Sequence, residues 1–138
     1  MPTVKRPSFL LRACAAFIAA APLAPAAATT GDDVSSGFVH HVYFWLNHPD
    51  SEVDRAALIE GLRTLSAAIK VRQFHIGVPA GTSRDVIDRS YAVSWMLVFD
   101  DRADQDAYQI DPAHLRFVEE RSKLWKKVIV YDTEPVNR

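Results

Sequence analysis

Residues 38–46, which read FVHHVYFWL, decide the fold of this 138-residue chain. Aromatic and β-branched residues dominate the stretch, and such a run is typical of a β-strand. Large side chains occupy both odd and even positions, so the stretch lacks the apolar–polar alternation of a strand with one face in water. We therefore expect a sheet that is covered on both faces.

The segments that follow alternate between helical and extended patterns. Ser51 and Asp54 are spaced like a capping box, and leucines then recur at helical spacing as far as Ile69. Asp111 and Pro112 form a second start signal, with Asp as the N-cap and Pro at the first helical position. The predicted strands are 38–46, 71–78, 91–99 and 127–133, and the later helices are 102–109 and 112 to about 125, with a polar loop at 79–90.

The order of these elements, βαββααβ, predicts an α+β, ferredoxin-like antiparallel sheet with its helices on one face. The other face would then expose more apolar surface than monomers commonly do. A second copy laid sheet on sheet would cover it, so we expect a homodimer. The residues expected on this uncovered face are Phe38, Val42, Phe44, Leu46, Ala92, Met96 and Val98.

The N-terminal segment is typical of a secretory signal peptide rather than of the fold. Three basic residues precede an apolar run, and the small residues at 24–28 suit a cleavage site. A membrane anchor is the main alternative, but two prolines interrupt the run; a lipid attached at Cys14 would require the run to precede that residue. We expect a signal peptide at 1–28, a disordered linker at 29–37 and one domain at 38–135, in a periplasmic or secreted protein with no stable membrane anchor.

Charge and cysteine content exclude several classes of protein. Removal of residues 1–28 would leave 110 residues without cysteine, and 13 basic against 17 acidic residues give a net charge of −4. An acidic exported domain is a poor match for nucleic acid, and without cysteine it has neither a disulfide framework nor a thiol nucleophile. We expect no nucleic-acid partner.

Histidine, tyrosine and tryptophan supply the candidate site. His41, Tyr43 and Trp45 share the odd face of the first strand, and His114 and Trp125 share one arc of the last helix. If that odd face meets the helices, His41 and His114 approach each other near Tyr108, six residues before His114. Imidazole titrates near neutral pH and a phenol can donate a hydrogen bond, which suits acid–base chemistry. The alternative for each histidine is a ring hydrogen-bonded to backbone.

Three segments resemble the stress-responsive dimeric α/β-barrel (Dabb) family: VHHVYFW at 39–45, FDD at 99–101 leading to AYQIDPAH at 107–114, and VIVYD at 128–132. The resemblance covers nearly all of residues 38–135. It implies a ferredoxin-like homodimer whose two sheets close into a barrel.

The chain is more distantly similar to olivetolic acid cyclase, a cofactor-free plant enzyme. The resemblance implies a pocket between sheet and helices in which His41, Tyr108 and His114 are the catalytic residues. A further cyclase histidine on the third strand falls on Val93, so this chain lacks one histidine of the cyclase set. The remaining residues expected at the ligand pocket are Tyr43, Trp45, Val93, Trp95, Trp125 and Asp132.

Two functions follow from these observations. The first is an exported stress-response homodimer that binds a small hydrophobic molecule between sheet and helices. The alternative is a cofactor-independent enzyme with cyclase-, lyase- or isomerase-like chemistry on a carbonyl or aromatic substrate. No cofactor is expected. No metal is expected either, because the spacing of His40, His41, His48, His75, Asp111 and His114 matches no metal signature.

Overall fold

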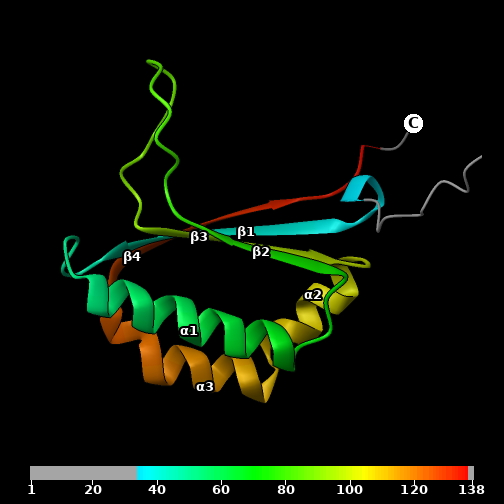
Figure 1. The fold of residues 1–138 in the computed structure, drawn as a ribbon. Coiled ribbons are helices and arrows are strands. Elements are labelled where there is room, and N and C mark those ends of the chain that lie inside the picture. The colour runs from blue at the N-terminus through cyan, green and yellow to red at the C-terminus, as the bar shows by residue number, and fades with distance from the viewer. Residues whose placement is uncertain (1–33, 137–138) are drawn as a thin grey trace, which may run out of the picture.

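The computed structural model describes residues 34–136, which form one antiparallel sheet with helices against one of its faces (Figure 1). The order of elements confirms the predicted βαββααβ arrangement and the ferredoxin-like α+β fold. The strands are β1 (Phe38–Leu46), β2 (Gln73–Gly77), β3 (Val93–Phe99) and β4 (Trp125–Thr133). The helices are α1 (Glu52–Ala68), α2 (Arg102–Gln109) and α3 (Pro112–Arg121), with short 3-10 turns η1 (Val34–Ser36) and η2 (Ser122–Leu124).

Strand β1 lies inside the sheet, whose order is β2-β3-β1-β4. Every neighbouring pair is antiparallel. In this register Asp132 of β4 lies opposite His40 of β1, although 92 positions separate them in the chain. The sheet therefore brings the end of the chain to the strand with which the fold begins.

Side-chain caps start each α-helix where the sequence predicts one. The oxygens of Ser51, Asp101 and Asp111 accept hydrogen bonds from backbone N–H groups in the first turns of α1, α2 and α3. Helices α1 and α3 lie side by side beneath the sheet (Figure 1). Gly61 permits their close approach, because a Cβ atom there would lie 3.0 Å from a ring carbon of Phe117.

The helices cover the even-numbered face of β1, and this corrects the predicted facing of that strand. Phe38, His40, Val42, Phe44 and Leu46 are all buried, whereas the odd-numbered residues between them are only half-buried. The expectation that the odd face meets the helices is therefore wrong. Large side chains occupy both odd and even positions, so the sequence shows no contrast between the two faces of the strand. The odd positions carry rings with polar atoms, and exposure of such rings to water costs less free energy than exposure of aliphatic side chains.

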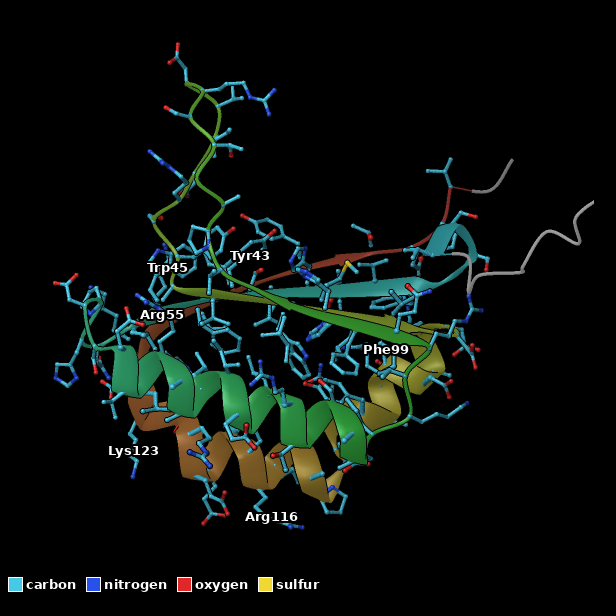
Figure 2. All side chains as sticks on the ribbon, viewed as in Figure 1. Tyr43, Trp45, Arg55, Phe99, Arg116 and Lys123 are labelled. Carbon is cyan, nitrogen blue, oxygen red and sulfur yellow. The ribbon has the colours of Figure 1, made fainter. Side chains whose placement is uncertain are left out.

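The other side of the sheet has no helix on it; we call it the open face. Tyr43 and Trp45 lie there, whereas Phe99 lies between sheet and helices (Figure 2). The register adds residues of β3 and β4 to the same side, so that the open face consists mainly of Val39, His41, Tyr43, Trp45, Met96, Ile129 and Tyr131. Of the residues predicted to be uncovered, Phe38, Val42, Phe44 and Leu46 lie on the helix side instead. Met96 and Val98 lie on the open face as predicted, although Val98 is buried.

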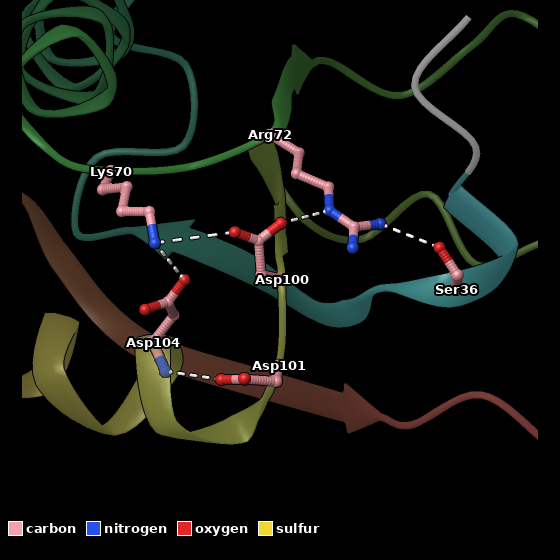
Figure 3. A network of polar contacts seen from close by, with 6 residues as sticks. All are labelled: Ser36, Lys70, Arg72, Asp100, Asp101 and Asp104. Carbon is pink, nitrogen blue, oxygen red and sulfur yellow. Dashed lines mark hydrogen bonds and ion pairs between the residues drawn. The ribbon is translucent and has the colours of Figure 1, made fainter. Parts of the chain in front are cut away.

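Ion pairs join the ends of several elements at one edge of the fold. Asp100, just after β3, pairs with both Lys70 and Arg72, which precede β2, and Lys70 also reaches Asp104 of α2 at 2.7 Å (Figure 3). Arg72 in turn donates to Ser36, 2.9 Å away. Ser36 belongs to the 3-10 turn, so this part of the expected disordered linker is ordered.

Other boundaries differ little from the predictions. The last helix ends at Arg121 rather than near Trp125, which instead begins β4. The segment between β2 and β3 is a long loop that projects from the sheet away from the helices (Figure 1). Within residues 34–136, no helix is both long and apolar enough to span a bilayer. The predicted signal peptide lies outside the described residues.

Candidate functional site

A pocket of about 280 Å³ lies between the sheet and the C-terminal helices. Its volume is close to the lower end for small-molecule sites, which suits a compact ligand. Aromatic and aliphatic side chains form most of the wall, and three polar-tipped rings interrupt it. The principal lining residues are His40, Val42, Phe44, Trp95, Tyr108, His114, Phe117, Trp125, Val128 and Val130.

His40 and Asp132 form the most constrained polar pair of the pocket. His40 is 4% exposed, and its Nδ1 lies 2.6 Å from Oδ1 of Asp132, whose side chain is 43% exposed. An ionised carboxylate only accepts hydrogen bonds, so Nδ1 of His40 must carry the proton. In the neutral ring, Nε2 then holds the free lone pair. This is the arrangement in which a carboxylate orients a histidine general base.

Tyr108 and His114 lie beside this pair on α2 and α3. Their ring centroids are 4.3 Å apart, and the Tyr108 ring lies 5.7 Å from that of His40. Nδ1 of His114 lies 3.1 Å from the carbonyl oxygen of Gln109, to which it donates, so a neutral His114 also keeps a free lone pair on Nε2. The structure thus brings two of the three predicted catalytic residues together.

Burial sets the protonation of the pocket. It lowers the pKa of His40 below its usual 6.5, although the hydrogen bond and charge of Asp132 act in the opposite direction. Burial also raises the pKa of Tyr108 well above its usual range, and the charges of Asp111 and Asp132 add to that effect. At neutral pH the pocket therefore offers a neutral imidazole as base and a protonated phenol as hydrogen-bond donor.

Three predicted site residues lie on the wrong side of the sheet for this pocket. His41, Tyr43 and Trp45 belong to the open face, because successive side chains of a strand point to opposite sides. Nδ1 of His41 lies 3.2 Å from the Tyr43 hydroxyl, and the pKa of His41 is lowered by burial and by neighbouring His75 and His40. His41 therefore does not meet His114.

Trp45 belongs instead to a separate surface groove of about 440 Å³ beyond the end of β1. Its indole N–H donates to Ser90 at 3.0 Å, and the Lys127 ammonium lies 4.3 Å from its ring centroid. Arg89 and Lys126 also border this groove. Its composition is more cationic than that of the helix-side pocket, and the two cavities share no lining residue.

The other predicted ligand-pocket residues lie on the helix side. Trp95 and Trp125 line the pocket. Asp132 does not line it but forms a hydrogen bond with His40, which does. Val93 is fully buried in the core but does not line the pocket. The residue that sequence reasoning missed is His40. It shares even parity with Phe44, but large side chains at both parities left no local signal for which face meets the helices.

The described residues contain no cluster of the side chains that most often ligate metal ions. Between residues 34 and 136, no three His, Cys, Asp or Glu side chains are grouped closely enough to ligate one ion. The pocket itself offers two imidazoles and one carboxylate engaged with His40. Its donors therefore suit hydrogen bonding and proton transfer to an organic ligand.

Solved structures from several organisms share this fold. A Dabb family protein of ferredoxin-like fold from Mesorhizobium loti is 24% identical, aligns over 73% of this chain and 99% of its own, and has a TM-score of 0.60. A dimeric ferredoxin-like protein of unknown function from Thermobifida fusca is 19% identical over 71% of this chain and 90% of its own, with a TM-score of 0.59. Hydroxynitrile lyase from Passiflora edulis is 18% identical over 72% and 93%, also with a TM-score of 0.59.

No curated protein matches the chain. The model of the Stress responsive A/B Barrel Domain matches residues 38–135, from the first residue of β1 to the residues that follow β4. This match agrees with the resemblance found in the sequence and with the ferredoxin-like sheet. The chain therefore belongs to the stress responsive A/B barrel domain family.

Proposed function

We propose that this protein binds a small, mostly apolar molecule with one carbonyl or hydroxyl group in the helix-side pocket, and that His40 moves a proton on that group. One observation carries the proposal: a buried histidine, held by a carboxylate 2.6 Å away, lines a mostly apolar pocket. A histidine that served packing alone would not need a carboxylate that holds the proton on Nδ1 and leaves the lone pair of Nε2 free.

The walls define the class of ligand. Phe44, Trp95, Phe117 and Trp125 offer flat apolar surfaces, and Trp125 stacks on Phe117 with ring centroids 5.9 Å apart. Burial of an apolar ligand against such rings would supply most of the binding free energy. The few polar groups at one side of the pocket would orient the ligand's single polar group.

The chemistry is proton transfer without a cofactor. For a carbonyl compound, Nε2 of His40 would take the proton of the adjacent C–H bond, and the electron pair of that bond would form the enolate. The Tyr108 hydroxyl would donate a hydrogen bond to the oxygen on which the charge develops. Return of the proton from His40 to the same carbon would give exchange only, and its delivery to another carbon of a conjugated enolate would complete an isomerisation. For a hydroxynitrile, His40 would take the hydroxyl proton, the C–CN bond would break as the carbonyl forms, and cyanide would take the proton.

The experiment measures exchange and cleavage separately. Purified protein is incubated in D2O with small ketones and β-dicarbonyl compounds, and NMR follows deuterium uptake at carbon; hydroxynitriles are assayed for release of cyanide, because a hydroxynitrile lyase shares the fold. Turnover of at least one class is expected, with a loss of about 100-fold or more in His40→Gln. His48→Gln is the matched control, since His48 is exposed, pairs with Asp54 and does not line the pocket.

Binding without turnover is the second candidate function, favoured by the apolar wall itself. Trp95 and Trp125 fluorescence reports occupancy directly. Ligand binding that survives His40→Gln, together with no turnover of any compound in wild type, would contradict the catalytic part and leave a carrier or sensor of small apolar molecules. Absence of both binding and turnover would contradict the whole proposal.

We also propose that two copies associate through their open faces. Related structures are described as dimeric, among them the Thermobifida fusca protein. Tyr131 on the open face is 60% exposed, and Val86 in the projecting loop is 90% exposed. A second sheet would cover these apolar groups, which agrees with the strands' apolar character on both faces.

Light scattering on the purified protein tests the association. The expected mass is twice that of one chain, which is 15.4 kDa if residues 1–28 are retained and correspondingly less if they are removed. Tyr131→Asp should shift the mass toward the monomer because it places a charge in the contact. Leu115→Asp is the control, since Leu115 is similarly exposed but lies on α3, on the other side of the fold. A monomeric wild-type protein would refute the proposal.

Export to the periplasm or beyond the cell is a further proposal, and it rests on the charge and apolar pattern of residues 1–28. Mass spectrometry of the protein recovered from its own cells should find a chain that begins near Thr29. Recovery of an intact N-terminus would contradict export by this route.

A further inference from the structure

We propose that the open face carries a binding site for a soft monovalent metal ion, copper(I), formed by His41, Met96 and His75 on three adjacent strands. This site lies on the opposite side of the sheet from the pocket of the proposed function. The site shares no side chain with that pocket, so the two can fail independently. It lies on the face through which two copies are proposed to associate, and the dimer would enclose it.

The sheet register aligns the three residues in one row. His41 of β1 lies opposite Met96 of β3, and Met96 lies opposite His75 of β2. Directly opposite residues project to the same side of a sheet, so both imidazoles and the thioether rise from the open face. With strands about 4.8 Å apart, the two histidine Cα atoms lie about 10 Å from each other, and the Cα atom of Met96 lies between them.

His41 has the orientation of a metal-ligating histidine. Its Nδ1 lies 3.2 Å from the Tyr43 hydroxyl, and its Nε2 is buried with no hydrogen-bond partner among the described residues. A buried nitrogen without a partner is costly in a folded protein. If Nδ1–H donates to Tyr43, Nε2 presents a free lone pair, and a hydrogen bond on the other nitrogen is the usual outer support of a metal-bound imidazole.

His75 leans in the same direction as His41. Its ring lies over Gly77, because a Cβ atom on that glycine would approach Cε1 of His75 to 2.8 Å. Tyr43, beside the His41 ring, and Gly77 both lie opposite Ser94 of β3. Both imidazoles are thus displaced toward the row that contains Ser94, and the absence of a side chain at Gly77 leaves room for the His75 ring.

The donor set selects the ion. Thioether sulfur is a soft ligand that favours copper(I), and imidazole binds the same ion well. The fourth residue of this row, Tyr131, is also uncharged, so the row contains no carboxylate to favour a hard divalent cation. Two nitrogens and one sulfur, all neutral, suit a three-coordinate monovalent ion.

The methionine signal can be assigned directly because the sequence contains only two methionines, Met1 and Met96. Protein labelled with ¹³C at the methionine methyl groups is titrated under nitrogen with copper(I) buffered by a competing chelator. The full chain with residues 1–28 retained is used, in a Cys14→Ser background that removes its one thiol. We expect one equivalent per chain to shift the Met96 methyl resonance. Met96→Leu and His75→Gln should each weaken binding by about tenfold or more.

His48→Gln is the matched control, since His48 is exposed and paired with Asp54 away from the sheet. Its affinity for copper(I) should equal that of the parent protein. Unchanged affinity in Met96→Leu, or a Met96 resonance that stays in place at one equivalent, would overturn the proposal. Tighter binding of zinc(II) than of copper(I) would also overturn it, because a thioether site should prefer the softer ion.

Discussion

The coupling between His40 and Asp132 is open to a direct energetic test. The perturbation is a double-mutant cycle of His40→Ala, Asp132→Ala and the combined variant, followed by urea unfolding at pH 7.5. A hydrogen bond to a charged group contributes about 1.5–3 kcal/mol. Asp132 is 43% exposed and can be rehydrated in the variant, so we expect a coupling near the lower limit, about 1.5 kcal/mol.

The chain contains a matched comparison for this cycle. His48 and Asp54 have nearly the same geometry, with Nδ1 and Oδ2 2.8 Å apart, but the His48 side chain is 78% exposed. Water competes for that hydrogen bond, so the same cycle there should give less than about 0.5 kcal/mol. All variants are compared at one protein concentration, because association changes apparent stability.

The single substitutions should differ as well. His40→Ala removes a ring that is 4% exposed and leaves a space beside the pocket, which should cost about 2–4 kcal/mol. Equal coupling energies in the buried and the exposed pairs would refute the reasoning, since burial would then play no part. A coupling near zero for His40 and Asp132 would show that the carboxylate does not hold the histidine.

The same pair predicts a dependence of stability on pH. The pKa of His40 is lowered in the folded state, so between that value and 6.5 the unfolded chain binds more protons than the folded one. Stability is therefore full above pH 6.5 and declines as the pH falls through the folded pKa. Asp132→Ala removes the interactions that raise this pKa, so NMR should find His40 titrating at a lower pH than in wild type.

Three further substitutions test other parts of the fold by urea unfolding. Gly61→Ala should destabilise the α1–α3 contact by about 1–2 kcal/mol because its new methyl group meets a ring, whereas Gly81→Ala, with open space around it, should cost much less. Ser66→Ala should cost about 1–3 kcal/mol because it leaves the buried indole N–H of Trp95, now 3.0 Å from the hydroxyl, without an acceptor. Asp100→Asn should cause a small loss that high salt abolishes, because its ion pairs are exposed; a loss that persists in salt would contradict this.

Tyr108 and His114 could be predicted as a pair because they are close to each other in sequence. Tyr108 and His114 lie on two short helices whose starts are marked by Asp101 and Asp111. A side-chain cap determines where each helix begins, and in α3 a proline at the first position adds to it. The spacing between the tyrosine and the histidine then brings their rings together without any long-range contact.

The wrong choice between His40 and His41 has a simple physical cause. Adjacent residues of a strand point to opposite faces, so a change of one position moves a side chain through the sheet. Residues 38–46 are large at both parities, and the local sequence therefore contains little contrast between the two faces. Only the position of the helices distinguishes the wall of a pocket from the open face.

The sequence by itself determined the order of the elements, the helix starts and a sheet that is apolar on both sides, because capping and side-chain period act over a few residues. Tertiary structure alone decided that His40 faces the helices, that Asp132 lies beside it, and that Met96 lies between His41 and His75. Those juxtapositions depend on strand register, which pairs residues tens of positions apart. Register is set by the packing of the whole sheet against its helices and has no local signature.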